Sequence, residues 1–155
     1  MGQNQFLEKI VRLGYSISER GGPAETNSQQ NGVCMQSKHK KILVVDDETD
    51  ILEFLNVLLE EEGYLVVITD KGEYIEELLN GGLPDLILLD MLLSGKDGRE
   101  IVKQLKRQEE TKHIPVIMFS AHPSAAWMAR EAGADDFIDK PFDIDDLLST
   151  VARNL

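Results

Sequence analysis

The chain has 155 residues, 42% of which are apolar, and it carries a formal net charge of −12. This length suits one domain with a core of ordinary size, and the negative charge disfavours nonspecific binding to nucleic acid or to an anionic membrane. Cys34 is the only cysteine, so an internal disulfide is excluded. The sequence also lacks the run of about 20 apolar residues that is needed to span a bilayer.

Residues 1–37 differ in composition from the rest of the chain. Their basic and acidic residues balance, so the whole net charge falls in residues 38–155. The stretch Gly21–Gly32 is rich in Gly, Asn, Gln and Ser, which is typical of a flexible linker. Apolar residues ahead of it have the spacing of one helix face: Phe6, Leu7, Ile10, Val11 and Leu13. We expect residues 1–37 to be an N-terminal extension, either a tail with a fraying helix or a small docking helix.

Beyond Lys40, short apolar runs alternate with segments of helical spacing. The runs typical of strands are residues 41–45, 64–69, 85–90, 114–120 and 135–139. The segments typical of helices are residues 50–63, 71–82, 98–108, 124–134 and 143–155. This alternation predicts βαβ units, and continuous apolar runs indicate parallel strands covered on both faces. We therefore predict an α/β domain over residues 38–155, with a five-stranded, doubly wound, flavodoxin-like parallel sheet of order 2-1-3-4-5.

Polar residues stand where the predicted strands end. Asp46 and Asp47 follow the first strand, Asp90 ends the third, Ser120 ends the fourth and Lys140 follows the fifth. In an open parallel sheet, functional residues gather beyond the carboxyl ends of the strands, at the point where the strand order reverses. We expect the three aspartates to share one pocket, with Ser120 and Lys140 on its other side.

Three adjacent carboxylates repel one another unless positive charge neutralises them. Mg²⁺ binds carboxylate oxygens, keeps several waters and binds well beside phosphate oxygens. With Lys140 as a second source of positive charge, the site could receive a phosphoryl group for attack by a carboxylate oxygen, with Ser120 as a hydrogen-bond donor. Taken singly, Asp47 or Asp50 could be a helix cap, Ser120 a turn residue and Lys140 a solvated side chain. Their joint occurrence favours the phosphoryl site, and Asp50 is better assigned to the first helical turn.

The domain resembles the receiver domain of two-component response regulators over roughly Lys40–Leu155. Four motifs carry the resemblance: VVDDE at 44–48, LILLDMLLSGKDG at 86–98, VIMFSA at 116–121 and DDFIDKPF at 135–142. The resemblance implies a phosphorylation switch rather than an enzyme. In such a switch Asp90 would accept a phosphoryl group from a sensor histidine kinase or a histidine phosphotransfer protein.

The resemblance also implies a metal site. Asp46 and Asp47 would bind Mg²⁺, Asp47 most directly, together with Asp90 and the backbone carbonyl of Leu92. Ser120 and Lys140 would contact the phosphoryl group.

A conformational response is implied as well. The Lys140–Pro141 bond would be cis, and Phe137 would turn inward as Ser120 moves toward the phosphoryl group. The face made by the fourth helix, fifth strand and fifth helix (helix 4–strand 5–helix 5) would then change shape, regulate a downstream protein or hold a homodimer.

Two departures from the family pattern are visible. Ser94 and Gly95 stand where the family usually has a proline four residues after the phosphoacceptor, which predicts a more mobile loop. The side chains of Leu92 and His122 occupy positions that, in similar proteins, influence how fast the acyl phosphate hydrolyses.

Rival functions fit the sequence less well. A phosphatase of the haloacid dehalogenase type needs a second aspartate two residues after the first, where this chain has Leu92. A flavodoxin-like flavin binder would meet repulsion between its phosphate and the acids at 46–48. A receiver that acts only as an unphosphorylated scaffold would not need the complete set of acids, hydroxyl and lysine.

The segment before the domain has no helix-turn-helix pattern and no basic stripe, and we expect no DNA-binding output after Leu155 unless this chain was cut from a larger one. We therefore expect output through a protein partner, with no direct contact with nucleic acid and none with a membrane. The single cysteine and the lack of a secretory signal lead us to expect a cytoplasmic protein.

Overall fold

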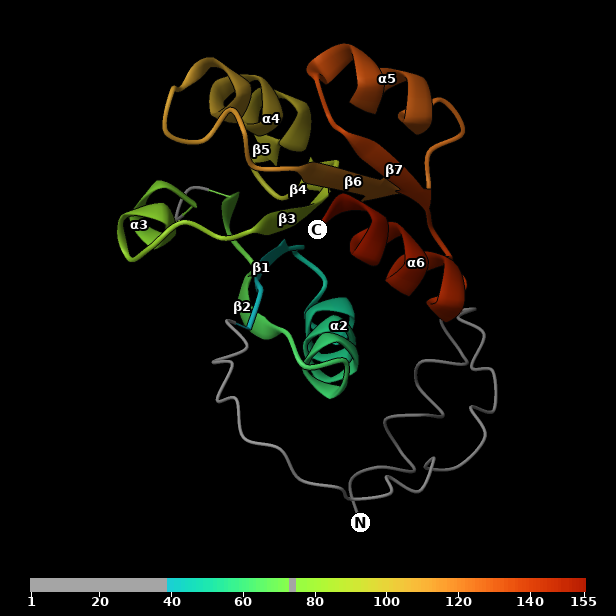
Figure 1. Ribbon diagram of the computed structural model, residues 1–155. Helices are drawn as coiled ribbons and strands as arrows, with labels where there is room; N and C mark the ends of the chain where they lie inside the picture. The colour runs from blue at the N-terminus through green and yellow to red at the C-terminus, as the bar shows by residue number, and fades with distance from the viewer. Residues whose placement is uncertain (1–38, 73–74) are drawn as a thin grey trace, which may run out of the picture.

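A twisted parallel sheet forms the frame of the domain, as the computed structural model in Figure 1 shows for residues 39–72 and 75–155. Its strands are β1 (Lys41–Val45), β2 (Leu65–Thr69), β3 (Leu86–Asp90), β6 (Val116–Ser120) and β7 (Asp136–Asp139). The spatial order is β2-β1-β3-β6-β7, and every neighbouring pair is parallel. This is the predicted order 2-1-3-4-5. The expected N-terminal extension, residues 1–37, lies outside the described residues.

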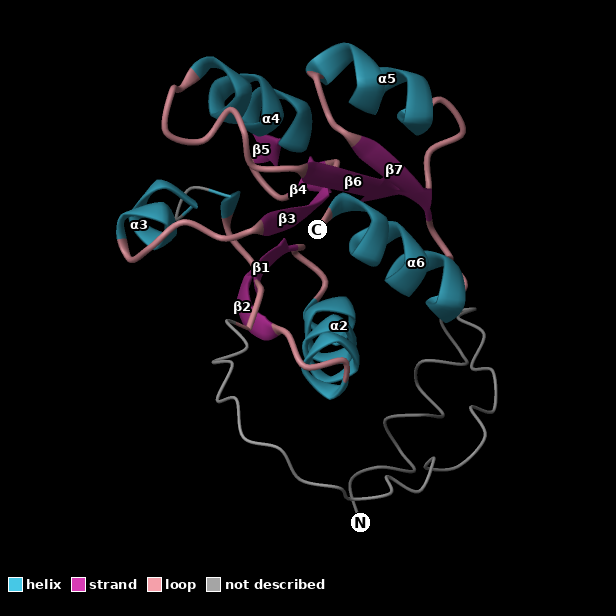
Figure 2. Cartoon of the chain, viewed as in Figure 1, coloured by secondary structure: helices cyan, strands magenta, loops and turns pink. Residues whose placement is uncertain are grey.

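Helices cover both faces of the sheet (Figure 2). They are α2 (Thr49–Glu61), α3 (Ile75–Asn80), α4 (Gly98–Arg107), α5 (Ala125–Ala132) and α6 (Ile144–Asn154). Helices α2 and α6 pack on one face with a first core cluster that includes Ile42, Leu88 and Phe119. Helices α3, α4 and α5 pack on the other face with a second core cluster that includes Leu43 and Leu89. The central strands β1, β3 and β6 are therefore buried on both sides, as their uninterrupted apolar runs predicted.

Local chemistry sets the ends of several helices. The Asp97 side chain accepts a hydrogen bond from Arg99 N and caps α4, and Asp143 caps α6 in the same way through Asp145 N. Gly133 ends α5 in the left-handed region, with φ of +97°. None of the helices in the described part of the chain has both the length and the apolar character that crossing a bilayer requires.

The structure contains one element that the sequence pattern did not predict. Strands β4 (Leu92–Leu93) and β5 (Lys96–Asp97) form a small antiparallel hairpin, with Ser94 and Gly95 between them. Gly95 has a φ of +85°, which suits glycine in a tight turn. The hairpin lies between β3 and α4, so it borders the carboxyl edge of the sheet where the predicted site lies.

Candidate functional site

Asp46 is the most deeply buried acid of the site. It follows β1 directly, and its residue is 0% exposed. Its Oδ1 accepts a hydrogen bond from Glu48 N at 2.8 Å, and its Oδ2 accepts one from Lys140 Nζ at 2.8 Å. Burial raises the pKa of Asp46 from 3.8 to about 6, although Lys140 opposes this shift. Both oxygens of this carboxylate therefore already have protein partners.

Asp47 is more open and faces the hairpin. Its Oδ2 accepts two hydrogen bonds from Ser94, one from the amide N at 3.0 Å and one from Oγ at 2.6 Å. The alternative of Asp47 as a helix cap is wrong, because Glu48 stands at the N-cap of α2. Asp50 lies in the first turn of that helix, as predicted.

Asp90 is the last residue of β3, and only 6% of its surface is exposed. Its Oδ1 lies 3.1 Å from Lys140 Nζ, and its Oδ2 accepts a hydrogen bond from Leu92 N at 3.2 Å. Burial raises the pKa of Asp90 above its ordinary value, although Lys140 and the Leu92 amide oppose this shift. Leu92 itself is 62% exposed. The role of the Leu92 carbonyl as a metal ligand stays a prediction.

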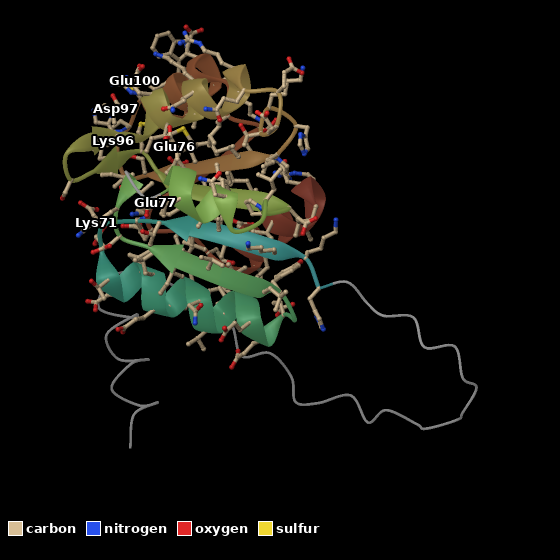
Figure 3. All side chains as sticks on the ribbon, turned by 90° about the vertical axis from the view of Figure 1, so that its left-hand side faces the viewer. Lys71, Glu76, Glu77, Lys96, Asp97 and Glu100 are labelled. Carbon is tan, nitrogen blue, oxygen red and sulfur yellow. The ribbon has the colours of Figure 1, made fainter. Side chains whose placement is uncertain are left out.

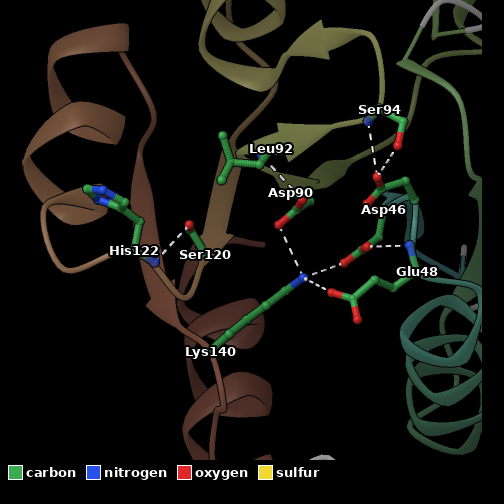
Figure 4. A network of polar contacts seen from close by, with 9 residues as sticks. Asp46, Glu48, Asp90, Leu92, Ser94, Ser120, His122 and Lys140 are labelled. Atoms are coloured by element: carbon green, nitrogen blue, oxygen red, sulfur yellow. Dashed lines mark hydrogen bonds and ion pairs between the residues drawn. The ribbon is translucent and has the colours of Figure 1, made fainter.

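Lys140 joins the acids at the centre of the site (Figure 4). Its Nζ contacts Asp46, Asp90 and, at 3.4 Å, Glu48, and it lies 4.8 Å from the centre of the Phe119 ring. Burial acts to lower the pKa of Lys140, but Asp46 and Asp90 outweigh it and raise the pKa above its usual range. Lys140 therefore stays charged, and the alternative of a solvated lysine is wrong because its side chain is only 9% exposed. The Lys140–Pro141 peptide bond is cis, as the resemblance implied.

Ser120 lies on the opposite side of Asp90 from Ser94 (Figure 4). It ends β6, is 2% exposed, and its Oγ accepts a hydrogen bond from His122 N at 3.2 Å. His122 is exposed, and its Nδ1 accepts a hydrogen bond from Ser124 N, which leaves the proton of a neutral ring on Nε2. Phe137 is half-buried on β7 and packs against the second core cluster.

The three aspartates can offer oxygens to one cation. Asp46, Asp47 and Asp90 each have a carboxylate oxygen within 4.8 Å of the others. The carboxylates are hard oxygen ligands, and their negative charge exceeds the single positive charge of Lys140. Mg²⁺ suits such a site, because it keeps waters in its coordination shell and Asp47 is partly open to solvent. The donor set therefore fits the predicted metal.

The structure thus brings together the site residues that the sequence predicted from four strand ends, whereas their chemical roles stay predictions. Several contacts at the site were not predicted; among them, Glu48 reaches Lys140, and Ser94 holds Asp47. The Ser94-Gly95 pair is a turn signal that could have indicated the hairpin, but nothing in the sequence indicated either contact.

Known proteins match this domain in sequence and in fold. The family model described as the response regulator receiver domain matches residues 42–152. The phosphate regulon transcriptional regulatory protein PhoB of Escherichia coli (strain K12) is 40% identical over 114 residues, which are 72% of this chain and 50% of PhoB. The chain therefore spans about half the length of the curated relatives that it matches.

Solved structures are also similar to this domain in fold. The chemotaxis response regulator CheY4 of Vibrio cholerae has a TM-score of 0.70 at 28% identity, over 76% of this chain and 100% of that one. NtrX from Brucella abortus has a TM-score of 0.70 at 35% identity, over 76% of this chain and 27% of that one.

One expectation about partners is wrong. We expected no direct contact with nucleic acid, because the sequence contains no DNA-binding pattern. PhoB is a transcriptional regulatory protein, and this chain spans half of its length. A missing pattern in that half does not exclude nucleic acid as a partner.

Proposed function

The chain belongs to the response regulator receiver domain family, and from that premise we propose that Asp90 accepts a phosphoryl group from a histidine kinase or a histidine phosphotransfer protein. Receiver domains of response regulators are phosphorylation-dependent signalling modules. The observation that carries the proposal is the position of Asp90 among two further aspartates and Lys140, at the carboxyl end of a central strand.

The proposed transfer is a single displacement at phosphorus. A carboxylate oxygen of Asp90 forms a bond to phosphorus, while the bond between phosphorus and the donor's histidine nitrogen breaks and leaves an imidazole. Lys140 Nζ lies 3.1 Å from Asp90 Oδ1, which supports the proposal that Lys140 binds one phosphoryl oxygen and Ser120 another. Mg²⁺ held by Asp46, Asp47, Asp90 and the Leu92 carbonyl would supply neutralisation of the phosphoryl charge.

The proposed output is a change in the face formed by α5, β7 and α6. Ser120 is linked to β7 because its carbonyl accepts a hydrogen bond from Lys140 N at 2.9 Å. Phe137 pairs with Met118 in the β6–β7 register, two residues before Ser120. At the same face, Asp136 anchors the end of α6 through Arg153 and Asn154. A shift of Ser120 toward the phosphoryl group could therefore reach Phe137 and this face, in a pre-existing equilibrium that phosphorylation biases.

Mass spectrometry tests the acceptor. Incubation with a small phosphodonor and Mg²⁺ should add the mass of one phosphoryl group, and Asp90→Asn should abolish the addition. Asp70→Asn, which removes another acid at a strand end, is the matched control and should label normally. Labelling that persists in Asp90→Asn would exclude Asp90 as the acceptor.

Amide exchange tests the output. On phosphorylation, exchange should change in residues 125–154 as well as around Asp90. A change confined to the residues around Asp90 would favour a receiver whose output face does not respond.

A further inference from the structure

We propose that Ser94 is a positioning residue for the metal ligand Asp47. Its amide N–H and its hydroxyl both donate to Asp47 Oδ2, at 3.0 Å and 2.6 Å. Among the described residues no other donor bonds to this carboxylate, so Oδ1 is available to a cation. Ser94 thus fixes the rotation of the carboxylate through one oxygen and leaves the other for Mg²⁺. This inference rests on the proposed metal site.

Asp47 differs from Asp46 in its burial and in the hydrogen bonds that its carboxylate oxygens already make. Asp46 is fully buried, and each of its oxygens is already bound, one by Glu48 N and one by Lys140. Asp47 is half-buried and borders a cavity of about 300 Å³, so solvent can reach it. Figure 3 shows Lys71 and Lys96, which also line this cavity, at the same end of the sheet. Asp47 is therefore the acid after β1 that has both access and a free oxygen.

Ser94 is itself held in place by the hairpin. The pairing of β4 with β5 closes the turn, and Gly98 N donates to Met91 O at 2.9 Å at its base. Because the hairpin holds Ser94 in place, its hydrogen bonds restrict the Asp47 carboxylate before the cation arrives. The Asp47 side chain therefore loses less rotamer freedom when the cation binds. Partners of this kind around a metal ligand typically change metal affinity by about 10–100-fold.

Calorimetric titration of the full chain with MgCl₂ tests the inference. Ser94→Ala removes the hydroxyl donor and keeps the amide donor, and it should weaken Mg²⁺ binding by about tenfold. Ser94→Thr keeps both donors and should restore wild-type affinity. Ser149→Ala, which removes an exposed serine hydroxyl on α6, is the matched control and should bind as the wild type does.

A double-mutant cycle separates positioning from a general structural effect. In an Asp47→Asn background, Ser94→Ala should no longer change the remaining affinity, because the carboxylate that it orients is gone. If the wild type binds Mg²⁺ and Ser94→Ala binds it equally well or more tightly, Ser94 does not position Asp47. If the wild type itself shows no Mg²⁺ binding, the proposed metal site fails, and this inference fails with it.

Discussion

The ammonium group of Lys140 lies 2.8 Å from Asp46 Oδ2, and the two side chains are only 9% and 0% exposed. The pair joins the end of β7 to the end of β1, and Lys140 also reaches Asp90 at the end of β3. Breaking a buried ion pair by removing one partner is strongly destabilising, because the other charge stays buried without compensation.

Lys140→Met should therefore destabilise the metal-free protein by roughly 3 kcal/mol, measured by urea unfolding in EDTA. Added Mg²⁺ should recover part of this loss, since it supplies positive charge to the same carboxylates. Lys103→Met is the control, because it removes only a surface pair with Glu100 and should cost less than about 0.5 kcal/mol. A loss in Lys140→Met as small as in the control would contradict a stabilising role for the buried pair.

Asp46 should make the metal-free protein less stable as pH rises. Burial raises its pKa in the folded state from 3.8 to about 6, so between these values the folded state binds the proton more tightly than the unfolded state does. Stability from this group is therefore present at low pH and is lost as pH rises through about 6, by at most about 3 kcal/mol.

Urea unfolding in EDTA at pH 4.5 and pH 7 checks this dependence. The wild type should lose stability relative to Asp46→Asn between the two pH values. Side-chain hydrogen bonds with Arg99 lower the pKa of Asp97. Burial acts to raise the pKa of Asp136, but hydrogen bonds with Arg153 and Asn154 outweigh it and lower this pKa. The stability that these two carboxylates contribute is therefore lost mainly below pH 3.8. A constant difference between wild type and variant would show that Asp46 does not titrate in this range.

Gly98→Ala should damage the site through the backbone. A Cβ on Gly98 would lie 2.3 Å from the carbonyl oxygen of Asp90, so either α4 or the β3 end must move. We expect a loss of about 1–3 kcal/mol in thermal or urea unfolding together with slower labelling of Asp90. Gly63→Ala is the control: a Cβ there meets nothing within 4 Å, but its φ of +89° carries a strain of about 1 kcal/mol. Its labelling rate should be unchanged, and equal labelling rates in both variants would contradict the expected displacement of Asp90.

Mg²⁺ should stabilise the folded protein by mass action. At a free concentration of 100 times its dissociation constant, the gain is about 2.7 kcal/mol, which a thermal melt reports as a higher Tm. Asp47→Asn should remove most of this gain at the same Mg²⁺ concentration. Asp70→Asn, which changes another acid on the same cavity, should keep it. Equal gains in the two variants would place the ion away from Asp47.

Much of the fold could be predicted because parallel strands covered on both faces appear in the sequence as uninterrupted apolar runs. The runs at 42–45 and 86–89 are apolar throughout, since each side chain meets a helix layer on one face or the other. The second helix was predicted over residues 71–82, but α3 covers Ile75–Asn80. The hairpin at Leu92–Asp97 was missed, because two-residue strands are too short to show any periodicity.

The sequence by itself determined which chemical groups stand at each strand end, because strand ends follow from local patterns of apolar and polar residues. Only the tertiary structure decided how these groups pair. Ser94 lies 47 residues from Asp47, and Lys140 lies 92 residues from Glu48. Contacts over such separations depend on where each loop returns and on which rotamer each side chain adopts, and neither quantity is encoded in a local pattern. The acids were therefore visible in the sequence, whereas the donors that orient them became visible only in the fold.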